Sequence, residues 1–482
     1  MNNKIKAVLI LICVILLGMF TAQWIVVLPE FYQIFTIALF ILTTILLLIK
    51  PRIGLDVKFL FFVCTGYAFG GKGFAYISPF EPFYVSEVCL VLCLIGFLLR
   101  FPDTWRSIFI SKFGLLALFL FLAYSGSRLI FFDFPRFRMM AIRDACIAYY
   151  ALYTFTTITA CQREENLRLL KQMFLIMGPL ALIGLTCNIT GATMKIHEVF
   201  PYAKSLFAPH DDIASPILAA SAATSFLKGA SEAKPHYIMY ALLAIIVLSF
   251  SKTAGVFCLL GLFGSLILFT QRKELIFSSI LVSVILVVTF SIILLFGIDL
   301  NIESAHLNTF SEVVELDIHS GNSSTTSWRL SWWRIITEDT WKTCPWTGFG
   351  FGGDISGPFA EEVLGVRMTP EVLSQAGFSR YPHNIFFTIL GRLGFPLVIL
   401  FTLMQAGIYF RIGRFARQFL SRGRVDYGLF MMISFVIAGL ANSFVQMTYE
   451  GPYAAIPHWV AIGGVYAYVM RARRVAKAQN AS

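Results

Sequence analysis

Long apolar runs separated by short polar loops recur along most of this 482-residue chain. Runs of about 15 to 25 apolar residues are long enough for helices that cross a hydrocarbon core about 30 Å thick, and they lack the alternation of a membrane β-barrel. The pattern predicts an all-α polytopic membrane protein with about 14, and at least about 12, transmembrane helices. The expected spans are 5–28, 32–49, 57–71, 82–99, 113–131, 139–160, 168–189, 212–227, 236–250, 253–271, 275–298, 383–411, 428–448 and 455–470.

One long polar segment, residues 301–382, interrupts this pattern. It divides a single membrane domain into N-terminal transmembrane helices over 1–300, a large loop over 301–382, and C-terminal transmembrane helices over 383–472. Because the loop is rich in glycine, tryptophan and arginine in an otherwise apolar chain, we expect the chemistry of the protein to lie there.

Lysine and arginine fall mostly in alternate short loops, a distribution that marks the cytoplasmic side of a membrane protein. This places both termini in the cytoplasm and the 301–382 loop outside, which in a bacterial inner membrane is the periplasm. The basic loops lie at 50–58, 100–112, 163–171, 228–234, 272–273, 411–424 and 471–477.

Composition supports the membrane class and limits the partners. The chain is 57% hydrophobic and 13% charged, whereas soluble proteins carry about 25% charged residues. The net charge of +11 comes from the loops between spans, so membrane lipids are expected partners and nucleic acid is not. The nine cysteines lie mostly inside apolar runs, where thiols pack as small hydrophobes, so no disulfide framework, metal site or cofactor is predicted.

Several ionisable residues fall on the predicted outer side, against the topology rule. Such groups are costly near the membrane unless they face water or a partner, which favours function, but long basic side chains also reach toward lipid phosphates. Both interpretations stay open for the arginines, whereas Lys252, which has almost no loop around it, favours function. The residues are Arg128, Arg136, Arg138 and Arg143 at one junction, Lys252 at another, and Lys195, His197, Lys204, His210, Asp211 and Asp212 in a further outer loop.

A helix is predicted over residues 328–341 of the large loop. Trp328, Trp332, Ile335 and Ile336 recur at helical spacing on one face, while Arg329 and Arg334 point elsewhere. A tryptophan face combined with arginines also suits a helix that lies at the membrane interface, so this alternative stays open.

Two further features follow in the loop. Gly348, Gly350 and Gly352 alternate with larger residues; this spacing lets backbone amides approach a phosphate, but it also permits simple tight turns. His383, preceded by Pro382 where the chain re-enters the membrane, is suited to general-base catalysis, although a packed or capping histidine is the alternative.

Together these residues resemble the O-antigen ligase and O-antigen polymerase superfamily of bacterial inner-membrane glycosyltransferases. The matching features span about 249–397, and the spacings from Asn384 to Gly394 and from Arg334 to Gly350 also match. The matching features are Ser249-Phe250-Ser251-Lys252, Trp328-Arg329 with Trp332-Trp333, Gly348-Phe349-Gly350-Phe351-Gly352, and Pro382-His383-Asn384 followed by Gly391-Arg392-Leu393-Gly394.

The resemblance implies a site for an undecaprenyl-diphosphate-linked glycan. By position, Lys252 and Arg329 would bind the diphosphate, and His383 would be the essential histidine. Lys252 replaces an expected arginine and lacks its bidentate fork, so Arg334 or Arg143 would complete the diphosphate site. Asn384, Trp328 and Gly350 would support it, and Leu397 departs from the small or hydroxyl residue expected there.

The implied activity is a metal-independent, inverting glycan transfer on the periplasmic face. A lipid-linked repeat as acceptor makes the protein a polymerase, which the Arg334 to Gly350 spacing favours, and lipid A-core or another terminal acceptor makes it a ligase. Two alternatives stay open: a metal-dependent lipid-linked glycosyltransferase that uses His210, Asp211 and Asp212, and a polysaccharide or lipid transporter.

Overall fold

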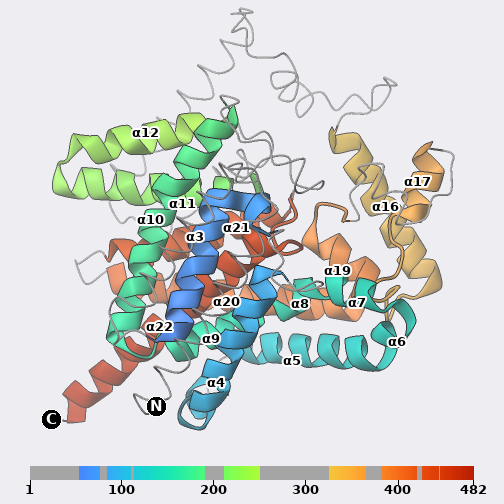
Figure 1. Ribbon diagram of the computed structural model, residues 1–482, viewed down its shortest axis with the longest axis horizontal. Coiled ribbons are helices and arrows are strands. Elements are labelled where there is room, and N and C mark those ends of the chain that lie inside the picture. Colours follow the sequence, from blue (N-terminus) through green and yellow to red (C-terminus); the bar gives the residue numbers. More distant parts are fainter. Residues whose placement is uncertain are drawn as a thin grey trace, which may run out of the picture.

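The computed structural model describes residues 54–75, 84–109, 113–189, 211–249, 325–364, 381–420, 426–444 and 446–481. All regular secondary structure in these residues is helical (Figure 1), which confirms the predicted all-α class. The helices are α3 Leu55–Ala75, α4 Val85–Phe109, α5 Phe113–Arg128, the π-helix η1 Leu129–Asp133, α6 Phe134–Phe137, α7 Met139–Asp144, α8 Cys146–Tyr149, α9 Leu152–Ala160, α10 Glu164–Ile189, α11 Asp211–Glu232, α12 Pro235–Ser249, α16 Thr325–Thr343, α17 Gly357–Leu364, α19 Ile385–Leu393, α20 Phe395–Leu420, α21 Tyr427–Ser443 and α22 Pro452–Ala481.

Three stretches among the described residues are long and apolar enough to cross a membrane: Gly114–Phe137, Glu164–Thr186 and Phe395–Phe415. The apolar helices Pro235–Leu248 and Tyr427–Ser443 are shorter. Four predicted spans, 5–28, 32–49, 253–271 and 275–298, lie outside the described residues. The total of about 14 spans and the sidedness of the chain therefore stay predictions.

The predicted span 383–411 is not one continuous helix. α19 ends at Leu393, and α20 begins at Phe395 after a break at Gly394. Gly394 has φ 80°, and a Cβ atom there would lie 2.7 Å from the carbonyl oxygen of Pro345, so only glycine lets the two backbones approach so closely. His383 therefore precedes a helix of nine residues rather than a full span.

The predicted span 139–160 is also divided, into α7, α8 and α9. Around the two junctions the amides of Ala148, Ala151 and Thr154 bond to carbonyl oxygens three residues earlier. Such i to i−3 bonds tighten the helix locally and redirect it.

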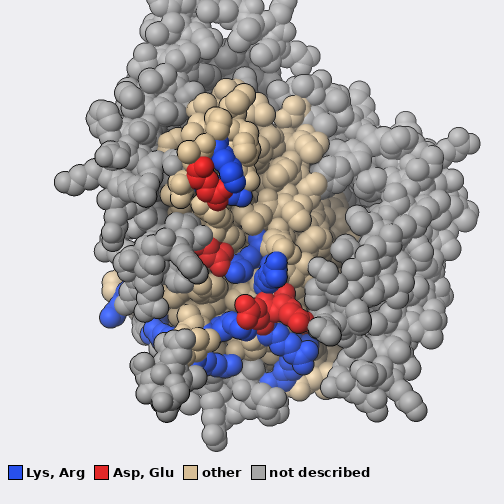
Figure 2. Space-filling model, turned by 90° about the vertical axis from the view of Figure 1, so that its left-hand side faces the viewer, with Lys and Arg blue, Asp and Glu red and all other residues tan. Residues whose placement is uncertain are grey.

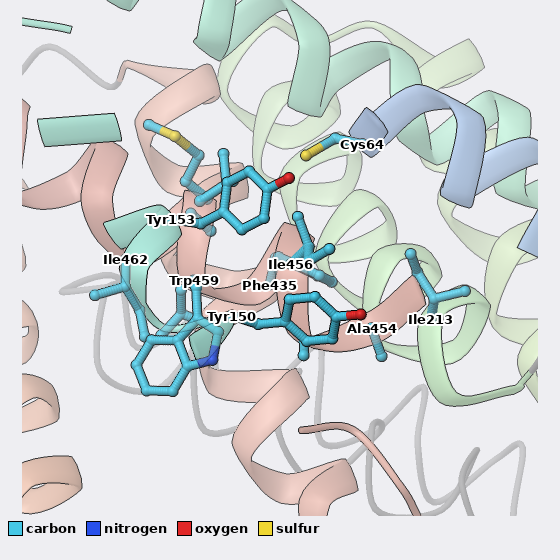
Figure 3. Close-up of a cluster of buried hydrophobic side chains, with 14 of the residues drawn as sticks. Cys64, Tyr150, Tyr153, Ile213, Phe435, Ala454, Ile456, Trp459 and Ile462 are labelled. Carbon is cyan, nitrogen blue, oxygen red and sulfur yellow. The ribbon is translucent and has the colours of Figure 1, made fainter. Parts of the chain in front are cut away.

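A large apolar core joins α3, α9, α10, α11, α21 and α22. Figure 3 shows part of it, where Tyr150 of the segment before α9 lies near Ile213 of α11, and Tyr153 and Trp459 lie near aliphatic side chains of α22. Cys64, Cys89 and Cys93 are buried and form no disulfide within the described residues, which agrees with the prediction that they pack as small hydrophobes.

The two ends of the helix assembly differ in their polar residues. The left-hand side of Figure 1 faces the viewer in Figure 2, which shows lysine and arginine side chains beside acidic ones. Among the residues that the sequence places on the cytoplasmic side, Lys171 pairs with Asp426 at 2.6 Å. The opposite end, at the right of Figure 1, carries α7, α16, α17 and α19. The predicted outer-loop residues that the structure describes thus meet away from the basic end.

Candidate functional site

Helix α16 presents its apolar face to the protein. Trp332, Ile335 and Ile336 are buried with Phe359 of α17. The Trp332 ring stacks on Phe359 at 5.0 Å, and its Nε1 donates to the carbonyl oxygen of Ile355 at 2.9 Å. These contacts confirm the predicted helix and the face assigned to these three residues; the side chain of Trp328 lies outside the described residues.

Trp333 attaches α16 to the segment that carries His383. Its Nε1 donates to the carbonyl oxygen of Pro382 at 2.7 Å, and its ring stacks on Phe387 of α19 at 5.0 Å. Arg329 lies four residues before Trp333 and therefore on the same side of the helix. The structure thus turns the Arg329 side of α16 toward the histidine segment, whereas Arg334 is exposed.

His383 lies immediately before the N-cap of α19. Asn384 is buried, accepts from the amide of Phe386 at 3.0 Å and donates to the carbonyl oxygen of Phe444 at 3.0 Å. His383 itself is partly buried with φ 55°, a left-handed conformation that is uncommon for residues other than glycine and is maintained only by its surroundings. Asn384 therefore acts as a helix cap, and the backbone on both sides of the histidine is constrained.

The glycine loop, residues 348–353, does not hold open amides for a ligand. Each of its backbone N–H groups donates to an acceptor within the protein. The acceptors are Cys344 O for Gly348, Gly391 O for Phe349, Arg392 O for Gly350, Asp133 Oδ2 for Phe351, Asp144 Oδ2 for Gly352 and Gly350 O for Gly353. Of the two interpretations of the glycines, the tight turn is therefore correct, and the loop serves to join α19 to the segment η1–α7.

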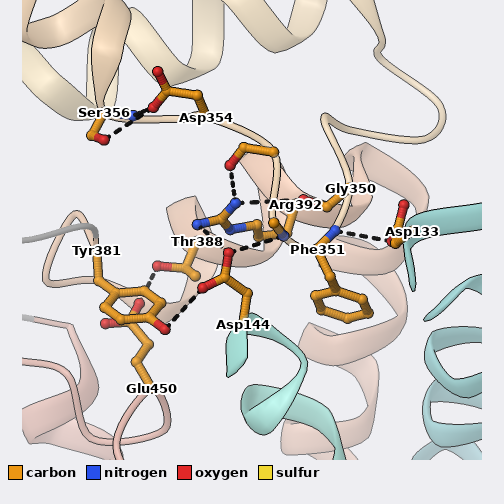
Figure 4. A network of polar contacts seen from close by, with 12 residues as sticks. Asp133, Asp144, Gly350, Phe351, Asp354, Ser356, Tyr381, Thr388, Arg392 and Glu450 are labelled. Atoms are coloured by element: carbon orange, nitrogen blue, oxygen red, sulfur yellow. Dashed lines mark hydrogen bonds and ion pairs between the residues drawn. The ribbon is translucent and has the colours of Figure 1, made fainter. Parts of the chain in front are cut away.

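A buried ion pair lies beside this loop (Figure 4). Arg392 Nη2 lies 2.9 Å from Asp144 Oδ2, and both side chains are almost fully buried. Arg392 also donates to the carbonyl oxygen of Gly353, and the hydroxyl of Tyr381 donates to Asp144 Oδ1 at 3.2 Å. Tyr381 is two residues before His383, so the network reaches the histidine segment.

Asp144 and Asp133 are site residues that no sequence motif marked. The signal for Asp144 was a carboxylate inside the predicted span 139–160, which is costly without a partner, whereas Asp133 lies between two predicted spans. A further buried carboxylate, Glu450 in the turn between α21 and α22, accepts a hydrogen bond from the hydroxyl of Thr388 of α19 in the same region (Figure 4).

The four arginines predicted at one outer junction have different surroundings in the structure. Arg128 pairs with Asp133 at 3.1 Å and donates to the carbonyl oxygens of Thr347 and Gly348, so it anchors the glycine loop. Arg136, Arg138 and Arg143 are exposed, and Arg143 directly precedes the buried Asp144. Of the four, Arg143 is thus the one beside the Tyr381 network.

Several predicted site residues lie outside the described part of the chain. They include Lys252, His210 and the loop up to residue 324, while Asp211 and Asp212 begin α11 without described side chains. Among the residues that the structure does describe, no group of three His, Cys, Asp or Glu residues could hold a metal ion.

Apolar helices long enough to cross a membrane, with arginine- and histidine-bearing segments joined at one end, define a polytopic helical membrane protein. Residues 237–402 match the family model described as O-antigen ligase. The match includes α12, α16, the glycine loop, α19 and the start of α20. This segment, about a third of the chain, is therefore similar to the O-antigen ligase family, and the similarity implies a glycosyltransferase-like activity. A comparison with curated proteins finds no match.

Proposed function

We propose that this protein is an inner-membrane glycosyltransferase that uses an undecaprenyl-diphosphate-linked glycan as donor on the periplasmic face and polymerises repeat units. The observation that carries the proposal is the contact between α16 and the histidine segment, in which Trp333 binds the Pro382 carbonyl oxygen at 2.7 Å. This contact turns a cationic side of one helix toward a histidine that precedes another.

Arg329 would bind the donor diphosphate, with Lys252, Arg334 and Arg143 as additional cations. A diphosphate is a good leaving group once its developing charge is neutralised, and guanidinium groups do this through charge-assisted hydrogen bonds without a metal ion. The partial burial of Arg329 lowers competition from water.

His383 would act as the general base. Its imidazole would accept the proton of an acceptor sugar hydroxyl while that oxygen attacks the anomeric carbon of the donor. The bond from this carbon to the diphosphate oxygen breaks with its electron pair leaving on the diphosphate, so the configuration inverts. The left-handed backbone and the Asn384 cap hold the histidine outside α19, where both substrates could reach it.

The acceptor decides between polymerase and ligase. The spacing from Arg334 to Gly350 supports the polymerase, and transfer to lipid A-core or another terminal acceptor is the alternative. Deletion of the gene tests this choice: retention of a single repeat on the acceptor indicates a polymerase, and accumulation of complete lipid-linked polymer indicates a ligase.

The catalytic assignment is tested with purified protein in liposomes that contain lipid-linked repeat units. Arg329→Ala should lower kcat by about 10² to 10³, the usual effect of removing one contact to a transition-state charge. His383→Asn should also abolish most transfer, because asparagine tolerates the left-handed backbone but supplies no base.

Lys342→Ala is the matched control, since Lys342 is an exposed cation on the same helix that pairs with the exposed Glu338. It should retain wild-type transfer. Full activity of His383→Asn would refute the role of the histidine, and loss of wild-type activity in EDTA would favour the metal-dependent alternative over the proposal.

A further inference from the structure

A network of Tyr381, Asp144 and Arg392 connects the histidine segment to the glycine loop and to α7 (Figure 4). We infer that this network positions His383 for catalysis. It does so through the hydrogen bond that the Tyr381 hydroxyl donates to Asp144. The inference rests on the function proposed above and assigns positioning residues to it.

Asp144 is the fixed point of the network. Its Oδ2 accepts from the Gly352 amide at 2.9 Å and lies 2.9 Å from the Arg392 guanidinium, and its Oδ1 accepts from Tyr381. The carboxylate is fully buried, and Arg392 is held in turn by the carbonyl oxygen of Gly353. Since its partners come from α19, the glycine loop and the histidine segment, Asp144 sets the relative positions of all three.

Tyr381 transmits this position to His383. Only Pro382 separates the two residues, and its ring restricts the intervening backbone. Trp333 binds the Pro382 carbonyl oxygen from one side, while Asp144 holds the Tyr381 hydroxyl from another. Burial and the Asp144 carboxylate raise the pKa of Tyr381 well above its ordinary value, so the phenol stays a donor throughout the working pH range.

The network also connects the histidine segment to Arg143, one of the residues proposed to bind the donor. Arg143 precedes Asp144 in α7 and is exposed where Asp144 is buried. A single buried carboxylate therefore determines the position of a cation for the diphosphate and of the base for the acceptor.

Tyr381→Phe tests the inference, because it removes one hydrogen bond and keeps the ring. With the full-length protein in liposomes and lipid-linked repeat units as substrate, kcat should fall by about tenfold, since a displacement of about 1 Å is enough to cost up to about 10²-fold. The KM for the donor should stay within about twofold of the wild-type value, because diphosphate binding by Arg329 is unaffected.

Tyr240→Phe is the matched control. The Tyr240 hydroxyl of α12 lies 2.9 Å from Ser221 Oγ, so its loss removes a comparable partly buried bond away from the histidine. This variant should show wild-type kcat and a loss of thermal stability no larger than that of Tyr381→Phe, whose hydrogen bond is to a carboxylate.

Three outcomes would overturn the inference: unchanged kcat in Tyr381→Phe, an equal fall of kcat in Tyr240→Phe, or a rise in donor KM that accounts for the whole loss. These results are distinct from failure of the proposed function. In that case the wild-type protein itself would transfer no glycan, or His383→Asn would be fully active.

Discussion

The ion pairs at the two ends of this protein have the same chemistry and different surroundings. At the basic end, Arg471 pairs with Glu164, whose side chains are 32% and 75% exposed. At the opposite end, the side chains of Arg392 and Asp144 are 1% and 0% exposed. Water and salt screen the first pair, whereas the second pair is shielded from both.

The difference shows which charges organise the structure. Removing one partner of an exposed ion pair costs little folding stability, because water solvates the charge that remains. A buried pair has a large desolvation penalty, so removing one partner leaves an uncompensated charge in the interior. The buried pairs at the site end therefore determine where the loop and α19 lie, whereas the exposed pair Arg471–Glu164 at the basic end contributes little to the stability of the fold.

The largest expected effect is that of Asp144→Ala. This substitution leaves the buried Arg392 guanidinium without its carboxylate and removes the acceptor of Gly352 and Tyr381. The free energy of unfolding should therefore fall by about 3–5 kcal/mol. Thermal or denaturant unfolding in detergent measures this loss. Because Asp144→Ala combined with Arg392→Met removes both charges, the double variant should lose less than the sum of the single variants; strict additivity would contradict the buried pair.

A smaller effect is expected in the glycine loop, where Gly350→Ala should lower the free energy of unfolding by about 1–3 kcal/mol. Gly350 has φ 92°, and a Cβ atom there would lie 2.5 Å from Asp133 Oδ1. Gly413 of α20 is the matched control, because a Cβ there meets nothing within 4 Å, and alanine in a helix should stabilise slightly. Equal responses of the two variants in thermal unfolding would show that the loop is not tightly docked.

The smallest effect is expected at the basic end. Arg471→Ala should change the free energy of unfolding by about 0–1 kcal/mol, and this difference should vanish in high salt. Comparing thermal unfolding at low and high ionic strength provides the test. A loss as large as that of Asp144→Ala, or one that is insensitive to salt, would remove the distinction between the two ends.

The helical class and the buried face of α16 could be predicted from local pattern. Apolar runs of membrane length and the spacing of Trp332, Ile335 and Ile336 depend on helix periodicity, which is a property of neighbouring residues. The similarity to the O-antigen ligase family could be predicted because the matching motifs are short and ordered along the chain. The placement of His383 before a nine-residue helix could not, because the break at Gly394 results from the close approach of the Pro345 backbone.

The roles of the glycine loop and of Asp144 likewise depended on partners far away in the chain. The glycine spacing is equally compatible with a phosphate cradle and with a turn, and only the acceptors contributed by α19, Asp133 and Asp144 decide for the turn. Arg128, which the sequence left open between function and lipid contact, proved to anchor the same loop.

The sequence alone determined that this protein is helical, has apolar helices of membrane length and carries motifs similar to those of the O-antigen ligase family. Hydropathy, helical spacing and short motifs are encoded locally, which is why the sequence is enough for them. Only the tertiary structure decided that Trp333 brings α16 to the histidine segment and that Tyr381, Asp144 and Arg392 meet beside it. The reason is physical: a buried carboxylate is stable only where donors from several helices converge, and that convergence exists only in the folded chain.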